Sequence, residues 1–267
     1  VELVSQQGQS YWDDFDVPSI FKRIVQSNSP EVEVVSGATQ SSNGVKQAVR
    51  NALEQAAAPE ETGADVTALL GKNVNTENAQ TVSYGGQQWT VIGYQGQGAA
   101  AREGSVTLLL KGSLGKASFD TDFDCDYGTS SLHGVIVKLA AGQTVGVLTP
   151  LQFTAGEKEA IGLRTLEPGT YAADGSCDGV SGKAVADQLV WPLSTKEALA
   201  LNGTIRTLDP DNTKDQVNTK WWLRSPGSND YVSAVVDSNG DVAIAGKSLM
   251  STYAIRPAFY LMADSVA

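Results

Sequence analysis

The sequence predicts an α+β fold in two parts: a small helical segment, then a larger domain of short antiparallel strands and hairpins. Apolar residues recur at helical spacing before residue 58. After residue 64 the chain breaks into short β-like segments separated by Gly, Asn and Asp. The stretch 58–64, Ala-Pro-Glu-Glu-Thr-Gly-Ala, is polar and reads as a linker. We therefore expect domains at 1–62 and 63–267.

The composition is that of a globular protein and limits its partners. The chain has 267 residues, of which 41% are hydrophobic, and this suffices for a packed core. Its 30 acidic and 19 basic residues give a net charge of −11, which repels nucleic acid and anionic lipid headgroups. No apolar run approaches the roughly 18 residues of a membrane span. We expect a soluble segment that binds no nucleic acid and does not insert into a membrane.

Two helices are expected in the first part. The first covers residues 17–28, where Pro18 suits the first turn. Its apolar residues at helical spacing are Ile20, Phe21, Ile24 and Val25. The second covers residues 42–57. Its apolar face consists of Val45, Ala48, Val49, Leu53 and Ala56.

The motif Ser36-Gly37-Ala38-Thr39 lies between these helices. It resembles the flavin-attachment segment of the FMN-binding domains of extracytoplasmic electron-transfer proteins. In that family the threonine carries FMN through a phosphoester bond to its hydroxyl. The resemblance implies FMN on Thr39, with Ser36, Gly37, Ala38 and Ser41 around it. A helix N-terminus next to the motif offers free N–H groups to a phosphate.

The resemblance extends over residues 1–62, which look like the C-terminal half of such a domain. The strands that open a family member would precede Val1. Three residues before the motif, Glu33 stands where the family has aspartate.

The larger part has several local signals for strands, helices and turns. Residues 88–94 and 105–111 read as a hairpin joined by the Gly- and Ala-rich turn 96–104. Residues 132–148 fit either a helix or a strand, and 154–161 reads as a capped helix.

Two further signals lie toward the C-terminus. Residues 187–194 predict a strand that runs into a helix, because Ser194 and Glu197 have the spacing of a capping box. The dipeptide Asn239-Gly240 predicts a tight hairpin turn between apolar segments.

A second resemblance depends on an ordered series of motifs. They are Tyr84-Gly-Gly-Gln-Gln-Trp89, Trp191-Pro-Leu-Ser-Thr-Lys-Glu-Ala198, Trp221-Trp-Leu-Arg-Ser-Pro-Gly227 and Ala254-Ile-Arg-Pro-Ala-Phe259. Over about residues 65–262 the chain resembles a domain of uncharacterised function in surface proteins of Gram-positive bacteria, whose signature is W-W-L-R-S-P-G followed by V-R-P-A. The resemblance implies a fold related to C-type lectins and to formylglycine-generating enzymes, used as a binding module. The active-site cysteine pair of those enzymes has no match here, so that oxidase activity is not expected, and any other enzymatic activity stays open.

The same motifs also have a structural interpretation. Trp221 and Trp222 would alternate across a strand, so that one ring is buried. Arg224 and Arg256 would lie at loop ends, where guanidinium groups bind backbone carbonyls or a carboxylate.

A ligand surface is expected on the loops around the last hairpin, because Tyr, Ser and Asn in loops give rigid contact area and adaptable hydrogen bonds. The candidate residues are Trp222, Asn229, Asp230, Tyr231, Lys247 and Tyr253. The alternative is an ordinary solvated loop.

The sequence thus favours an exported, cell-surface binding protein that recognises a glycan or protein ligand. The alternative function is an extracytoplasmic flavoprotein that carries FMN on Thr39 for electron transfer.

Cysteine, histidine and aspartate give weaker signals. Cys125 and Cys177 fit one disulfide, which is typical of exported proteins, or two unpaired thiols. With His133 as the single histidine, no zinc-ligand spacing exists. The stretch 120–128 alternates four aspartates, which fits a solvated acidic edge better than calcium, because the spacing is not that of an EF-hand. No metal site is expected.

Overall fold

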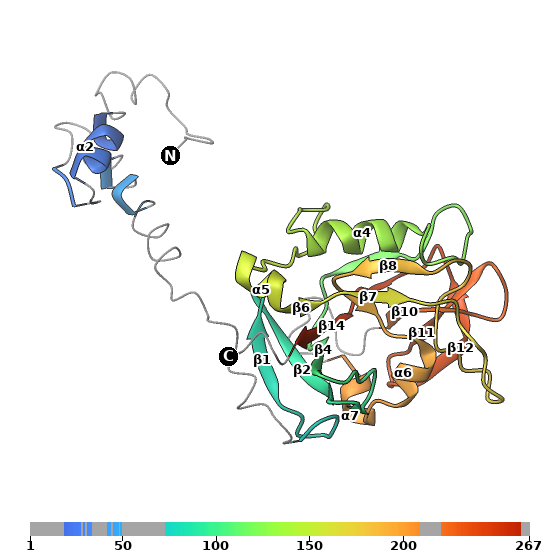
Figure 1. Cartoon of the computed structure of the whole chain (residues 1–267). Coiled ribbons are helices and arrows are strands. Elements are labelled where there is room, and N and C mark those ends of the chain that lie inside the picture. Colours follow the sequence, from blue (N-terminus) through green and yellow to red (C-terminus); the bar gives the residue numbers. More distant parts are fainter. Residues whose placement is uncertain are drawn as a thin grey trace. The chain divides into compact units, whose positions relative to one another are not determined.

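The structure is a computed structural model of the chain. It describes residues 19–27, 29, 31–33, 42, 43, 45–47, 49, 73–208 and 220–262. The chain divides into two compact units, Val1–Thr62 and Gly63–Ala267 (Figure 1). Within the described ranges, no helix has the length and apolar character needed to cross a membrane.

The described part of the smaller unit is helical, with a small apolar core. Helix α2 runs over Ser19–Ser27, and Ser42, Asn43, 45–47 and Val49 are also helical. Its buried residues come from both segments and are Ile20, Ile24, Val45 and Val49, with Val32 packed against them. Val25, expected on the apolar face of α2, is instead 76% exposed. The reason is that it lies one position after Ile24 and points about 100° away from it around the helix.

The larger unit is built on three sheets within residues 73–208 and 220–262. The first sheet has the order β1-β2-β4-β14-β6, with β3 beside β2 and β9 beside β14. The second has the order β12-β11-β10-β13-β5, and the third pairs β7 with β8. The strands are β1 Thr81–Tyr84, β2 Gln87–Tyr94, β3 Gln97–Gly98, β4 Ser105–Leu110, β5 Lys116–Ser118, β6 Ile161–Gly162, β7 Arg164–Leu166, β8 Val185–Gln188, β9 Trp191–Pro192, β10 Trp221–Pro226, β11 Val232–Val236, β12 Val242–Ser248, β13 Thr252–Ala254 and β14 Pro257–Met262.

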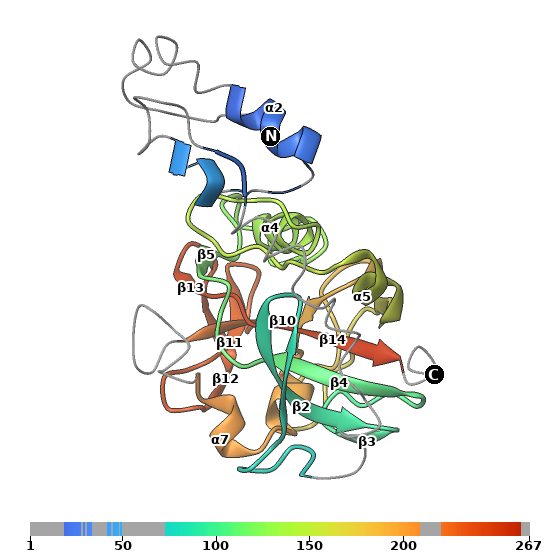
Figure 2. The same ribbon diagram turned by 90° about the vertical axis from the view of Figure 1, so that its left-hand side faces the viewer.

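Pairing between these strands is antiparallel, except that β13 runs parallel to β10. Strand β14 lies inside the first sheet, where it pairs with β4, β6 and β9. Figure 2 shows β14 running beside β4 through the middle of the unit. Strands β2 and β4 form the hairpin expected from the sequence, with Trp89 opposite Leu110. The structure thus confirms a mixed α+β fold built on antiparallel sheets.

Short helices surround the sheets of the larger unit. They are α4 Ser131–Ala140, α5 Ala155–Ala160, α6 Thr195–Leu199 and α7 Gly203–Arg206. In both views α4 lies on one side of the unit and α7 on the opposite side (Figures 1 and 2). The ambiguous segment 132–148 therefore begins as a helix. The Ser130 hydroxyl fixes the start of that helix by accepting a hydrogen bond from the His133 amide.

Two predicted helix starts are confirmed as capping boxes. Thr154 and Glu157 exchange side-chain to backbone hydrogen bonds at the start of α5. Ser194 and Glu197 do the same at the start of α6. These bonds satisfy amides that have no partner in the first turn of a helix.

The predicted hairpin around Asn239-Gly240 is also confirmed, between β11 and β12. The Asp237 carboxylate accepts hydrogen bonds from the amides of Asn239 and Asp241. Gly240 has φ +84°, a conformation that residues with a Cβ rarely adopt.

Strand β10 is buried along its whole length, which corrects two expectations. Trp221 and Trp222 are both buried, because each face of the sheet is covered by other elements. Arg224 lies within this strand and is not at a loop end.

Candidate functional site

The candidate flavin-binding residues, Ser36, Gly37, Ala38, Thr39 and Ser41, lie outside the described part of the chain. The residues shortly before them are held by two cationic side chains. Arg23 of α2 donates from Nη1 to the carbonyl oxygen of Glu33 over 3.3 Å. Lys46 donates from Nζ to the carbonyl oxygen of Val32 over 2.8 Å. Two positive charges therefore lie next to the segment that leads into the motif.

The residues expected to bind a ligand in the larger unit fall into two groups. Asn229, Asp230, Tyr231 and Lys247 are exposed. The Oδ1 atom of Asn229 accepts a hydrogen bond from the Tyr231 amide over 3.0 Å, which shapes the turn between β10 and β11. The Tyr231 ring contacts that of Phe123 at a centroid distance of 6.1 Å.

Phe123 is a surface residue that sequence reasoning missed. It is 48% exposed and Tyr231 is 63% exposed, so the two rings form an aromatic pair facing solvent. Phe123 has φ +61°, which is strained for a residue with a bulky side chain. Exposed neighbours of the pair in sequence, Asp122, Asp124 and Asp230, give this surface an acidic character. The sequence places Phe123 and Tyr231 far apart and gives no signal that their rings meet.

Trp222 is not a ligand contact, which corrects the expectation from the sequence. It is 1% exposed, and its Nε1 donates to the Ala117 carbonyl oxygen over 2.8 Å. Its ring packs against Tyr253 at 4.9 Å and Phe119 at 5.4 Å. Tyr253 is half-buried, and Lys220 Nζ lies 5.8 Å from the centre of its ring. Trp222 therefore supports Tyr253 from the core.

The two cysteines are free and buried thiols, which is the second of the two alternatives left open by the sequence. Cys125 Sγ lies 3.8 Å from Ser181 Oγ and 4.0 Å from Asp230 Oδ1. Cys177 Sγ lies 3.9 Å from the Gly179 carbonyl oxygen. Each cysteine side chain turns inward although its neighbours in sequence are polar. Burial raises the pKa of the Cys125 thiol.

The aspartates of 120–128 organise their own loop. Asp120 accepts hydrogen bonds from the amides of Asp122, Asp124 and Ser131. Burial tends to raise the pKa of Asp120, but these amides outweigh it and the pKa is lowered. Among the residues that the structure describes, no group of three or more His, Cys, Asp or Glu side chains could hold a metal ion.

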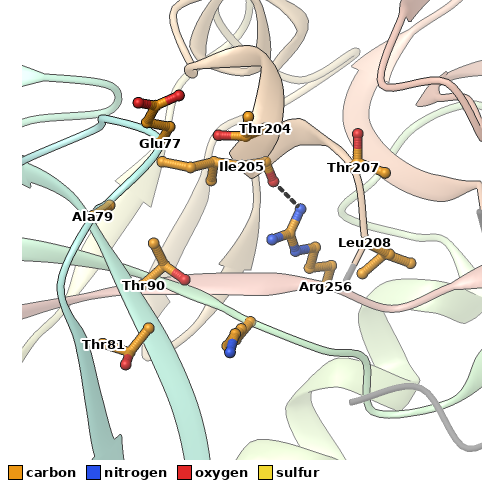
Figure 3. A pocket seen from close by; sticks show the side chains of 10 residues that line it. Glu77, Ala79, Thr81, Thr90, Thr204, Ile205, Thr207, Leu208 and Arg256 are labelled. Carbon is orange, nitrogen blue, oxygen red and sulfur yellow. Dashed lines mark hydrogen bonds between the residues drawn. The ribbon is translucent and has the colours of Figure 1, made fainter. Parts of the chain in front are cut away.

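A cavity of about 650 Å³ lies at one edge of the first sheet, beside α7. Figure 3 shows the Arg256 guanidinium reaching into the space that Thr90, Ile205 and Glu77 surround. The residues that line the cavity are Glu77, Ala79, Thr81, Thr90, Lys111, Thr204, Ile205, Thr207, Leu208 and Arg256. Sequence analysis singled out only Arg256 among them, as a structural residue.

Two backbone carbonyls and a tryptophan ring hold the Arg256 side chain just before β14. Its Nε donates to the Leu110 carbonyl oxygen and its Nη1 to the Ile205 carbonyl oxygen, each over 2.7 Å. Its guanidinium also lies 5.1 Å from the centre of the Trp221 ring. The expectation that Arg256 binds backbone carbonyls is confirmed. These contacts hold a positive charge at the wall of the cavity.

Two models of known families match the chain, one in each of its two parts. A model described as an FMN-binding domain matches residues 5–54, and one described as a domain of unknown function (DUF6273) matches residues 148–263. Both resemblances expected from the sequence are therefore found, the second over a shorter range than 65–262. No curated protein and no solved structure matches the chain. The chain is thus similar to an FMN-binding domain near its N-terminus and to a domain of unknown function over most of its C-terminal half.

Proposed function

We propose that the chain is a flavoprotein in which FMN is joined to Thr39 and serves electron transfer outside the cytoplasm. The observation that carries this proposal is the match of residues 5–54 to an FMN-binding domain, a stretch that includes Ser36-Gly37-Ala38-Thr39. When bound, FMN supplies one- and two-electron redox chemistry. The residues of the chain attach it, orient it and balance its charge.

The described residues of the smaller unit suit a phosphate group. A phosphoester retains a negative charge, and Arg23 and Lys46 bring positive charge to the segment before the motif. Both side chains donate to carbonyl oxygens of that segment, so they also fix the chain that leads to Thr39. The shared core of Ile20, Ile24, Val45 and Val49 holds the two helical segments together.

The attachment step itself is a group transfer. The Thr39 hydroxyl attacks the FMN phosphorus of flavin adenine dinucleotide, AMP leaves, and the hydroxyl proton passes to solvent. The donor and a flavin transferase must be supplied with the exported chain. The intact chain should then gain the mass of one FMN less one water. Its flavin absorbance should stay with the protein after denaturation.

Variants make this experiment specific to one hydroxyl. Thr39→Val should abolish the added mass, because it removes the acceptor and keeps the shape of the side chain. Thr62→Val, at the boundary of the two units, should leave the added mass intact. A colourless chain of unmodified mass in the presence of the transferase and its donor would refute the proposal.

We propose ligand recognition at the cell surface as a second function, served by the larger unit. The observation that favours it is the exposed pair of Phe123 and Tyr231, beside the exposed polar residues Asn229 and Asp230. Aromatic rings with adjacent amide and carboxylate groups suit a glycan or a protein ligand. Lys247 and Tyr253 belong to the same proposal as flanking contacts.

Binding to a glycan array and to whole cells tests the second function. Tyr231→Ser and Phe123→Ser should each remove most of the signal. Leu163→Ser, which changes an exposed apolar residue elsewhere, should keep it. Equal binding by all three variants would refute this surface as the ligand site.

The lectin-like relationship of the larger unit is part of the same proposal. It is supported by the W-W-L-R-S-P-G motif on β10 and by the antiparallel sheets around it. An experimental structure that superimposes on C-type-lectin-like domains would support it, and a different strand order would refute it.

A further inference from the structure

The loop between β5 and α4 meets the turn between β10 and β11 at two points. The rings of Phe123 and Tyr231 contact each other at a centroid distance of 6.1 Å. The buried Sγ of Cys125 lies 4.0 Å from Oδ1 of Asp230. The Asp230 carboxylate is therefore held against the loop that carries Phe123. An exposed carboxylate thus lies beside an exposed pair of aromatic rings.

The turn between β12 and β13 joins the same region. The Leu249 amide donates to the Tyr231 carbonyl oxygen over 3.2 Å, and the Leu249 carbonyl oxygen accepts from the Phe119 amide over 2.8 Å. Leu249 thereby connects the start of β11 with the start of the loop that carries Phe123. Met250 follows Leu249 and is 54% exposed. Exposed aromatic and methionine side chains from three segments are typical of a surface that binds another protein.

The loop that carries Phe123 is held in place by the chain itself. Asp120 is buried and accepts hydrogen bonds from the amides of Asp122, Asp124 and Ser131. Phe123 adopts φ +61° within this loop, and its ring still faces solvent. Strained residues of this kind are found at binding sites, where the surrounding structure keeps them in one conformation. A surface fixed in this way loses little conformational entropy when a partner binds.

The charged groups around the aromatic pair give this surface a negative charge. Asp122 and Asp124 flank the first ring in sequence, and Asp230 precedes the second. Among residues 121–124, 228–231 and 247–251, the exposed charges are these three carboxylates and Lys247. The chain as a whole has a net charge of −11. Charge complementarity therefore favours a partner segment that is positively charged.

The arrangement of the two rings indicates which cation fits. Their planes are inclined by 70°, so they do not form one flat platform on which a sugar ring could stack across both. A guanidinium group is planar and can lie over the face of one ring while its N–H groups donate to a carboxylate. The sequence neighbours Asp230 and Tyr231 offer these two groups side by side.

We infer that this surface binds an arginine-bearing segment of a partner protein, with the guanidinium between the Tyr231 ring and the Asp230 carboxylate. Phe123 and Met250 contact apolar residues beside that arginine, and Asp122 adds a second carboxylate. The inference rests on the proposed ligand recognition by this surface and specifies the chemistry of the partner.

Fluorescence anisotropy of labelled peptides with the full chain tests the inference. The probe is a peptide of Leu-Arg-Gly repeats. Its matched control carries citrulline in place of each arginine, which keeps the size of the side chain and removes its charge. The arginine peptide should bind saturably, and the citrulline peptide should bind at least about fivefold more weakly, because it lacks the cation–π and charge-assisted contacts.

Variants of the chain locate the binding site. Tyr231→Ser and Phe123→Ser should each weaken binding of the arginine peptide by about threefold or more, because each removes an aromatic ring. Asp230→Asn should weaken it by about threefold, since it removes one ion-pair partner. Asp241→Asn makes the same charge change on an exposed residue beyond the other end of β11, and should leave the affinity unchanged. Thermal melting curves check that each variant folds.

The inference is overturned if the arginine peptide does not bind, or if the citrulline peptide binds as tightly. It is also overturned if folded Asp230→Asn and Tyr231→Ser bind the arginine peptide as tightly as Asp241→Asn does. Should Tyr231→Ser fail to fold, the same comparison is made with Phe123→Ser.

The glycan-array and whole-cell measurements separate a failure of this inference from a failure of the proposed surface function. If Tyr231→Ser loses glycan or cell binding while the arginine peptide does not bind, the surface function stands and only the arginine partner is overturned. If Tyr231→Ser and Phe123→Ser change neither glycan, cell nor peptide binding, both proposals are overturned.

Discussion

Glu197 and Arg224 form a bidentate ion pair inside the larger unit. Oε2 of Glu197 lies 2.5 Å from Nη1 of Arg224, and Oε1 lies 3.0 Å from Nη2. The same carboxylate accepts a hydrogen bond from Arg164 Nη2 over 2.7 Å and one from the Ser194 amide over 2.9 Å. One side chain thus closes the capping box of α6 and connects it to β10 and β7.

Replacing Glu197 with Gln should destabilise the larger unit by about 3–5 kcal/mol, because it leaves Arg224 buried without its negative partner. Urea unfolding monitored by tryptophan fluorescence measures this change. Glu159→Gln on α5 is the matched control, since Glu159 is exposed and its substitution should change stability by less than about 0.5 kcal/mol. A loss for Glu197→Gln no larger than that of the control would contradict the assigned role.

The same ion pair should make stability fall in acid. Burial alone would raise the pKa of Glu197, but the charges of Arg224 and Arg164 and the bond from Ser194 lower it from 4.5 to about 2. Because the folded pKa lies below the unfolded value, this stability is complete above pH 4.5 and is lost as the pH falls toward 2. The contribution is on the order of 3 kcal/mol. Unfolding free energies from pH 6 to pH 2 should show the difference between the original chain and Glu197→Gln shrinking.

Two glycines should respond to alanine in opposite directions. Gly240→Ala should cost about 1 kcal/mol or more, because φ is +84° and the new Cβ would lie 3.0 Å from Thr207 Oγ1. Gly134→Ala lies within α4 with open space around the Cβ, so it should stabilise the chain by about 0.5–1 kcal/mol. Thermal melts of both variants check the signs. A stabilised Gly240→Ala would contradict the turn geometry.

The buried thiols should resist chemical modification until the chain unfolds. Cys125 and Cys177 are both buried, and the raised pKa of Cys125 lowers its thiolate fraction. A thiol reagent should therefore label neither cysteine in the native chain and both in denaturant. Mass spectrometry counts the labels. Unlabelled cysteines in denaturant without reductant would show that a disulfide had formed.

Features set by neighbouring residues were predictable from the sequence. The capping box of Ser194 with Glu197 and the Asn239-Gly240 turn depend on residues within four positions of each other, and both are present. The hairpin of β2 and β4 followed from alternating apolar residues. Val25 was misplaced because a short helix has too few apolar residues to define its buried face.

Features that depend on packing between distant parts of the chain could not be predicted from local sequence patterns. The burial of Trp222 depends on elements that cover both faces of the sheet, and those come from distant parts of the chain. The cavity is lined by residues that lie far apart in the sequence, among them Lys111 and Arg256, and no local pattern specifies that they come together. The contact between Phe123 and Tyr231 was not predictable either, because the two residues lie on loops that are far apart in the sequence.

The position of β14 has a consequence for how the larger unit is made. This strand, Pro257–Met262, is synthesised after every other strand of the first sheet, yet it pairs with β4, β6 and β9 inside that sheet. A growing chain that has not yet reached Met262 leaves the β4 edge open. The sheet therefore closes only after β14 has been synthesised, and until then the unit depends on protection of its exposed strand edges from association with other chains.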